Sequence, residues 1–144
     1  MPLITPANKF LWLAGLLTLF LGVLAGRQWL AEARWRSPLY CFATPQQVWS
    51  AAPRPDAWTP VCPQSTTYRR EVRQGDSRVE QFRLPGWQPR AVLQVLREAG
   101  YVQLEDELEG ADHYSAFIGK SVAGELSYTA LKEGSDTLIT VSGR

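Results

Sequence analysis

The chain has 144 residues, of which 45% are hydrophobic and 20% are charged, and its formal net charge at neutral pH is +1. This composition excludes a disordered or fibrous chain. A net charge so close to zero also excludes the polycationic character that drives non-specific binding to nucleic acid. We therefore expect one small folded domain behind an apolar N-terminal segment, with no nucleic-acid partner.

Residues 1–36 are predicted to anchor the chain in a membrane. Phe10 to Gly26 is a run of 17 residues without a charge, and a helix of that length covers about 25 Å, the short end of a membrane span. The span can continue to about Ala31, because the guanidinium of Arg27 can reach the lipid headgroups and a tryptophan suits the interface. The residues expected to contact membrane lipid are Phe10, Leu13, Leu17, Leu21, Leu24 and Trp29.

A cleaved signal peptide is the alternative to an anchor. Val23, Leu24 and Ala25 are tolerated at the positions that a signal peptidase reads, so cleavage after Ala25 is one hypothesis. However, the hydrophobic run is longer than the usual core of a signal peptide, and no Gly or Pro follows Gly26 until Pro38. We therefore favour an uncleaved helix that continues out of the bilayer.

The flanking charges and the cysteines favour different sides of the membrane for the folded domain. The amino terminus and Lys9 precede the apolar run, whereas Arg27, Arg34 and Arg36 follow it. The cytoplasmic side normally holds the excess of positive charge, which here is one group. By contrast, an even pair of cysteines in a small exported domain commonly forms a disulfide. We give more weight to the pair, Cys41 and Cys62, and predict a disulfide-closed domain on the extracytoplasmic side; the pair supplies too few ligands for zinc.

Residues 37–65 are predicted to be a proline-rich linker with one short helix. Thr44 is the expected N-cap, Pro45 the first helical residue and Gln47 the partner in a capping box. Trp49 and Trp58 are expected to pack against the domain, since burial is the common use of such rings. A platform for a sugar or a peptide is the alternative role for the two rings.

Residues 66–144 are predicted to form the folded domain, beginning with a β-hairpin. Two extended runs flank turn residues 74–77, although this register would place Glu71 opposite Glu80 and Arg73 opposite Arg78. The arginines of the hairpin could form an interaction surface, and acidic residues interrupt them in a way that argues against nucleic acid. The candidate interaction residues of this surface are Arg69, Arg70 and Arg73.

The clearest helix is expected between Pro89 and Gly100. Val92, Val95, Leu96 and Ala99 form one apolar stripe, so we expect the helix to cover a sheet. Alternating patterns then predict strands over residues 101–108 and 113–119.

The last two strands are predicted over residues 124–132 and 137–143. Their register places Lys132 opposite Thr137, with one apolar face that includes Tyr128 and Ile139 and one face rich in hydroxyl groups. The expected fold is α+β, an antiparallel sheet covered by one main helix, behind an N-terminal transmembrane helix.

No catalytic, cofactor or metal site is predicted. The chain has one histidine, His113, so a catalytic arrangement that needs an imidazole depends on it alone. Glu105, Glu107 and Asp112 lie near it in the sequence, but their spacing matches no known ligand pattern. A hydrolase or metal enzyme that uses His113 and this acidic cluster is kept as an alternative hypothesis.

Charge is distributed unevenly along the domain. Residues 37–90 contain seven arginines and four acidic residues, whereas residues 91–144 contain four basic and nine acidic residues. Such an asymmetry can steer a charged partner. The preferred hypothesis is a non-catalytic, single-pass accessory subunit that binds other membrane or envelope proteins, and a cleaved, secreted domain that binds a ligand or peptide is the alternative.

Overall fold

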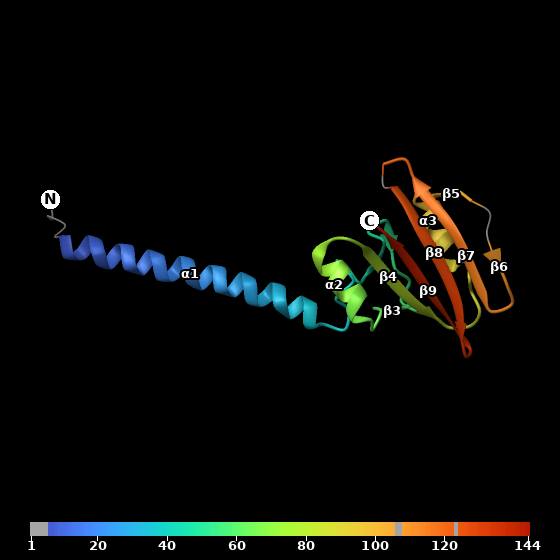
Figure 1. Cartoon of the computed structure of the whole chain (residues 1–144), viewed down its shortest axis with the longest axis horizontal. Helices are drawn as coiled ribbons and strands as arrows, with labels where there is room; N and C mark the ends of the chain where they lie inside the picture. Colours follow the sequence, from blue (N-terminus) through green and yellow to red (C-terminus); the bar gives the residue numbers. More distant parts are fainter. Residues whose placement is uncertain (1–5, 106–107, 123) are drawn as a thin grey trace. The chain divides into compact units, whose positions relative to one another are not determined.

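The computed structural model describes residues 6–105, 108–122 and 124–144, with side chains described from residue 11 onward (Figure 1). The chain divides into two compact units, of which the first ends at Ser37 and the second is Pro38–Arg144. The proline-rich segment predicted as a linker is therefore part of the second unit, and no compact unit begins at residue 66.

The first unit is the helix α1 (Pro6–Arg36). Its 31 residues correspond to about 46 Å, more than the roughly 30 Å of a bilayer's hydrocarbon core. The most apolar 18-residue window within Leu11–Arg36 has a mean hydropathy of 1.5, and none of it is buried within the chain. By length and composition α1 can therefore cross a membrane, a criterion that signal sequences also meet. Phe10 lies in α1, but its side chain is outside the described part. The other predicted lipid-facing residues are all exposed: Leu13, Leu17, Leu21, Leu24 and Trp29.

The second unit is built on one antiparallel sheet, which confirms the predicted α+β class. Its strands follow the order β3-β4-β9-β8-β7-β5, and β6 pairs with β7. The strands are β3 (Thr59–Val61), β4 (Arg78–Leu84), β5 (Val102–Gln103), β6 (Leu108–Glu109), β7 (His113–Lys120), β8 (Gly124–Glu133) and β9 (Asp136–Gly143).

The hairpin of β8 and β9 has the predicted register. Lys132 pairs with Thr137, and the strands continue to Glu133 opposite Asp136. The loop between them contains Gly134, whose φ of 63° lies in the left-handed region that glycine tolerates best. An alternating pattern and a compatible turn were sufficient to define this pairing.

The two faces of the sheet differ in chemistry. Phe82, Ile139, Ala130 and Tyr114 lie in register across the four central strands and are all buried, so their side of the sheet is the core face. The opposite side, which we call the open face, carries a row of polar groups in the neighbouring register positions: Gln81, Thr140, Thr129 and Ser115, each partly exposed.

The helix α3 (Ala91–Glu98) covers the core face, as predicted (Figure 1). Its apolar stripe is buried at Val92, Leu93 and Leu96. The Tyr128 hydroxyl from β8 reaches the beginning of α3, where it accepts a hydrogen bond from the Leu93 N–H at 3.2 Å and donates one to the Pro89 carbonyl at 2.8 Å. Because Arg90 provides no side-chain cap, the sheet supplies the cap that this helix lacks.

Replacing Tyr128 with Phe should therefore weaken the docking of α3. The variant keeps the ring but leaves the Leu93 N–H and the Pro89 carbonyl without the hydroxyl that pairs them. We expect a loss of about 1–3 kcal/mol in the free energy of unfolding, the usual effect of an unsatisfied buried polar group. Urea denaturation measures it, and an unchanged midpoint would contradict the capping role.

The prediction of a strand in the first half of the hairpin is wrong, because residues 66–74 form the helix α2 (Thr66–Gln74). Ser65 is its N-cap and accepts a hydrogen bond from the Tyr68 N–H, and Gly75 ends it in the left-handed conformation with φ 78°. The helix also avoids the like-charge pairs that the hairpin register would have created. The strand β4, predicted as the second half, instead pairs with β3 and β9.

The short helix predicted from Thr44 is also wrong. The segment forms a small hairpin of β1 (Gln47–Val48) and β2 (Ala52–Pro53). Trp49 and Ser50 connect the two strands with φ values of 51° and 55°, which a right-handed helix cannot contain. A tertiary contact with Glu80, described below, stabilises this turn over the local capping signal.

The strand predicted over residues 101–108 is interrupted. Val102 and Gln103 pair with β7 as β5, and Leu108 and Glu109 pair with it as β6. Residues 106–107 between them lie outside the described part of the chain. The strand predicted over residues 113–119 is confirmed as β7.

The predicted disulfide joins Cys41 to Cys62, whose Cα atoms lie 5.7 Å apart. It closes the segment that carries β1 and β2. Tyr40, next to it, is fully buried and donates a hydrogen bond to the Pro63 carbonyl at 2.8 Å. The disulfide and this hydrogen bond therefore fix the two ends of the loop to each other.

Removing the disulfide should destabilise the second unit without changing its fold. The sequence separation of 21 residues corresponds to about 3 kcal/mol in the chain-entropy model. We expect that loss in a double variant, Cys41→Ser with Cys62→Ser, measured by urea denaturation of the full chain in detergent micelles. Reductant should shift the wild type to the same midpoint and leave the variant unchanged; equal stability of wild type and variant would contradict a stabilising role.

Candidate functional site

The two tryptophans predicted as a packing pair or a platform are both buried. Trp49 is 6% and Trp58 is 8% exposed. Trp58 meets Phe82 of the core face edge-on, with ring centroids 6.4 Å apart. The rings therefore have the packing role preferred from the sequence, and they do not offer the exposed faces that a sugar or peptide platform requires.

The three arginines predicted as interaction residues lie on α2. The Arg69 guanidinium lies over the ring of Tyr40, 4.2 Å from its centroid, and so helps to fasten α2 to the disulfide-closed segment. Arg70 and Arg73 are exposed. The structure thus separates these arginines from the buried tryptophans.

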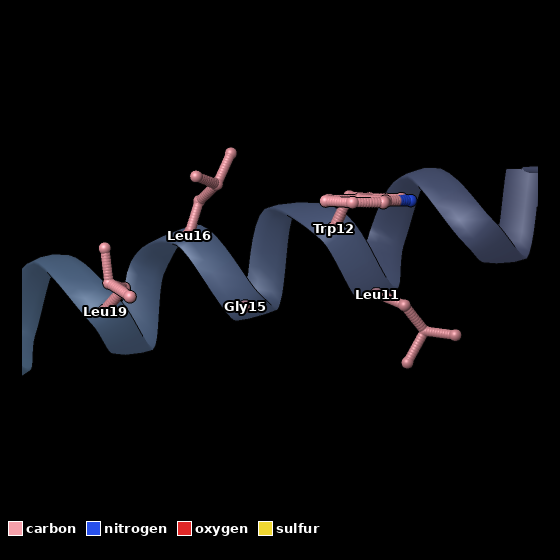
Figure 2. Close-up of a pocket in the computed structure, with 5 residues that line it drawn as sticks. All are labelled: Leu11, Trp12, Gly15, Leu16 and Leu19. Atoms are coloured by element: carbon pink, nitrogen blue, oxygen red, sulfur yellow. The ribbon is translucent and has the colours of Figure 1, made fainter.

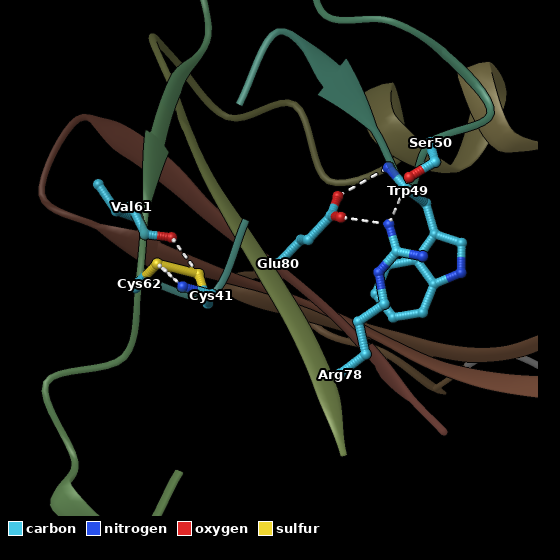
Figure 3. Close-up of polar contacts among 7 residues, drawn as sticks. All are labelled: Cys41, Trp49, Ser50, Val61, Cys62, Arg78 and Glu80. Carbon is cyan, nitrogen blue, oxygen red and sulfur yellow. Dashed lines mark hydrogen bonds and ion pairs between the residues drawn. A yellow bond between two sulfur atoms is a disulfide. The ribbon is translucent and has the colours of Figure 1, made fainter. Parts of the chain in front are cut away.

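A buried carboxylate, Glu80, connects the β1–β2 turn to the sheet (Figure 3). It lies on the core face of β4 and is 1% exposed. One oxygen accepts a hydrogen bond from the Trp49 N–H at 2.7 Å, and the other pairs with Arg78 at 2.6 Å. The Arg78 guanidinium also lies over the Trp49 ring, 4.2 Å from its centroid, and donates to the Ser50 hydroxyl at 2.9 Å.

Burial dominates the electrostatics of this cluster. Desolvation raises the pKa of Glu80 above its ordinary value, while the hydrogen bonds from Arg78 and Trp49 and the charge of Arg78 act in the opposite direction. A perturbed carboxyl group can indicate a catalytic site. Here, however, both oxygens are used to hold the turn, so the arrangement is structural.

Replacing Glu80 with Ala should release the β1–β2 turn. The Trp49 N–H would lose its acceptor inside the fold, and Arg78 would lose its ion partner. We expect a loss of about 2 kcal/mol in the free energy of unfolding, measured by urea denaturation. The matched control is Glu133→Ala, which removes a bridge to Arg83 between two exposed side chains and should cost less than about 1 kcal/mol. Equal effects of the two substitutions would contradict the role of Glu80.

A groove lies between α2 and the open face of the sheet, and we call it the α2 groove. Its volume is 780 Å³. The side chains that carry its chemistry are two aromatic rings, three carboxylates, three hydroxyl groups and one guanidinium: Tyr68, Phe117, Glu71, Asp76, Glu125, Ser77, Ser127, Ser142 and Arg144. It is the candidate binding site because it combines exposed rings with charged groups in a concave surface.

The α2 groove continues into the polar row of the open face. Phe117, Ser127 and Ser142 line the groove and are also neighbours in register across β7, β8 and β9. The hydroxyl-rich face predicted for the last two strands thus forms the floor of the site. The wall formed by α2 was missed, although Ser65 as an N-cap and Gly75 as a C-cap were available signals for a helix.

The described residues of the hypothetical enzyme site do not form a metal-binding group. Across residues 6–105, 108–122 and 124–144, no three His, Cys, Asp or Glu side chains come together as metal ligands. Glu109, a neighbour of this cluster in the sequence that was not predicted as part of it, forms an exposed bridge with Arg90 at 2.8 Å. Glu107 lies outside the described residues.

A shallow notch of 520 Å³ lies on α1 over Gly15 (Figure 2). Its lining is apolar: Leu11, Trp12, Leu16 and Leu19 surround the glycine. Such a notch on an apolar helix is suited to lipid chains, and the one polar side-chain group in its lining is the indole N–H of Trp12.

No family model matches this chain, and neither do curated proteins or solved structures. The function must therefore be inferred from the chain's own features. These are the apolar helix α1, the disulfide-closed unit and the α2 groove.

Proposed function

We propose that the chain is a non-catalytic, single-pass membrane protein whose second unit binds other membrane or envelope proteins on the extracytoplasmic side. The observation that carries the proposal is α1, whose span is long, apolar and unburied within the chain. Such a surface is unfavourable in water and stable in lipid. The helix also continues without a break past Ala25 to Arg36, which supports an uncleaved anchor.

The disulfide supports the extracytoplasmic side. Disulfides persist in oxidising compartments and are rare in the cytosol, and the bond between Cys41 and Cys62 lies in the unit that follows α1. The disulfide favours the side opposite to the one that the count of positive charges around the apolar run favours. A difference of one positive group is the weaker of the two signals.

The histidine supports a non-catalytic role. The His113 side chain is half-buried in β7 and has no hydrogen-bond partner among the described residues. A general base is normally oriented by such a partner. The α2 groove, by contrast, has the mixture of rings and charges that suits recognition.

Deleting residues 10–26 should release the chain from the membrane, because the deletion removes most of its apolar span. We expect the wild type to remain in the membrane pellet after carbonate extraction and the deletion variant to appear in the supernatant. Replacing the same residues with an alternating Leu and Ala run is the control, and it should restore membrane retention. A deletion variant that stays in the pellet would contradict the anchor.

Intact mass and thiol alkylation of the native protein test cleavage and topology together. The proposal requires a full-length chain whose thiols react only after reduction. A mature chain beginning at Gly26 would favour the secreted alternative, whereas free thiols in a full-length chain would place the domain in a reducing compartment.

A further inference from the structure

We propose that the α2 groove binds a basic segment of a partner protein, with arginine or lysine side chains lying across Tyr68 and Phe117 and their charged ends at Asp76 and Glu125. The inference rests on the proposed function, because it names the chemistry of the partner that the anchored unit binds. It is carried by the shape, the exposed rings and the charge of the groove.

The groove offers apolar area that the fold leaves uncovered. Tyr68 on α2 is 43% exposed and Phe117 on β7 is 40% exposed. Ser127 on β8 and Ser142 on β9 pair in register and form part of the floor. The volume of 780 Å³ falls within the range of about 300–1,000 Å³ that is usual for ligand clefts.

The charge of the groove selects a cationic occupant. Its lining has three carboxylates and one guanidinium, that of Arg144. Glu71 accepts a hydrogen bond from the Ser77 hydroxyl at 3.4 Å, whereas the carboxylates of Asp76 and Glu125 have no hydrogen-bond or ion-pair partner among the described residues. Unpaired carboxylates beside aromatic rings attract a positive group both by charge and by the ring quadrupole.

The fold already contains one example of this combination. Arg78 lies over the Trp49 ring and pairs with Glu80, so an aromatic face and a carboxylate together hold an arginine within this domain. Arginine and lysine have an apolar stem and a charged end, which match a ring and a carboxylate respectively. A peptide backbone can both donate hydrogen bonds to the serine hydroxyls and accept them, whereas a protonated polyamine can only donate.

The test uses the full chain in micelles of an uncharged detergent and a short labelled peptide in which arginine alternates with valine. Fluorescence anisotropy should show saturable binding that weakens as salt is added. The double variant Asp76→Asn with Glu125→Gln should weaken binding at least about fivefold. Phe117→Ala should weaken it by a similar factor, because it removes the ring that packs the stem.

Matched controls keep the same chemistry outside the groove. Asp56→Asn with Glu98→Gln removes one aspartate and one glutamate that are exposed elsewhere, and Leu131→Ala trims an exposed side chain of the open face that does not line the groove. Both should change the affinity less than about twofold. The proposal is overturned if the peptide does not bind, if a peptide with glutamate in place of arginine binds equally, or if the groove and control variants behave alike. Competition by spermidine at the same concentration as the peptide would assign the groove to polyamines instead.

The same variants separate this inference from the proposed function. Carbonate extraction of the groove variants should show unchanged membrane retention, because none of their substitutions lies in α1. Retention without peptide binding would overturn the groove proposal alone. Peptide binding by a chain that is not retained in the membrane would overturn the anchor alone.

Discussion

The attachment of the β1–β2 turn to the sheet depends on one buried carboxylate. Glu80 lies on the core face, where an ionised group without partners would be strongly unfavourable. The Trp49 N–H and Arg78 provide those partners. The N–H is available because Trp49 and Ser50 adopt left-handed conformations. The strained turn and the buried charge thus stabilise each other, and the disulfide restricts the same segment at Cys41 and Cys62.

Elements that local patterns determine were predictable, and elements that depend on distant partners were not. The β8–β9 hairpin follows from alternation and a tight turn, and α3 follows from one apolar stripe. The β1–β2 turn depends on Glu80, about thirty positions further along the chain, so local capping rules at Thr44 favoured a helix that does not form. The arginine-rich segment of α2 fits both a helix and a strand by its pattern. Only its two caps, Ser65 and Gly75, distinguish the helix from the strand.

The candidate site was only half predictable for the same reason. Alternation along β8 and β9 predicted a hydroxyl-rich face, and that face supplies Ser127 and Ser142 to the groove. The groove itself exists because α2 lies beside the sheet, which no local pattern reveals. The arginines of this segment were predicted as interaction residues of a hairpin, whereas the residues of α2 that line the groove are Tyr68 and Glu71. If a helix had been predicted between Ser65 and Gly75, the helical period would have distinguished the face with Tyr68 and Glu71 from the arginines.

An anchored domain can act through a shallow, charged groove. Exposed ion pairs contribute little free energy each and are screened by salt, so a groove with Asp76 and Glu125 at its surface is suited to weak, reversible binding. Confinement to a membrane raises the effective concentration of a partner held in the same membrane, which compensates for weak contacts. The two features would therefore have different roles. The helix α1 would keep the domain close to its partner, and the α2 groove would need only to select a basic segment.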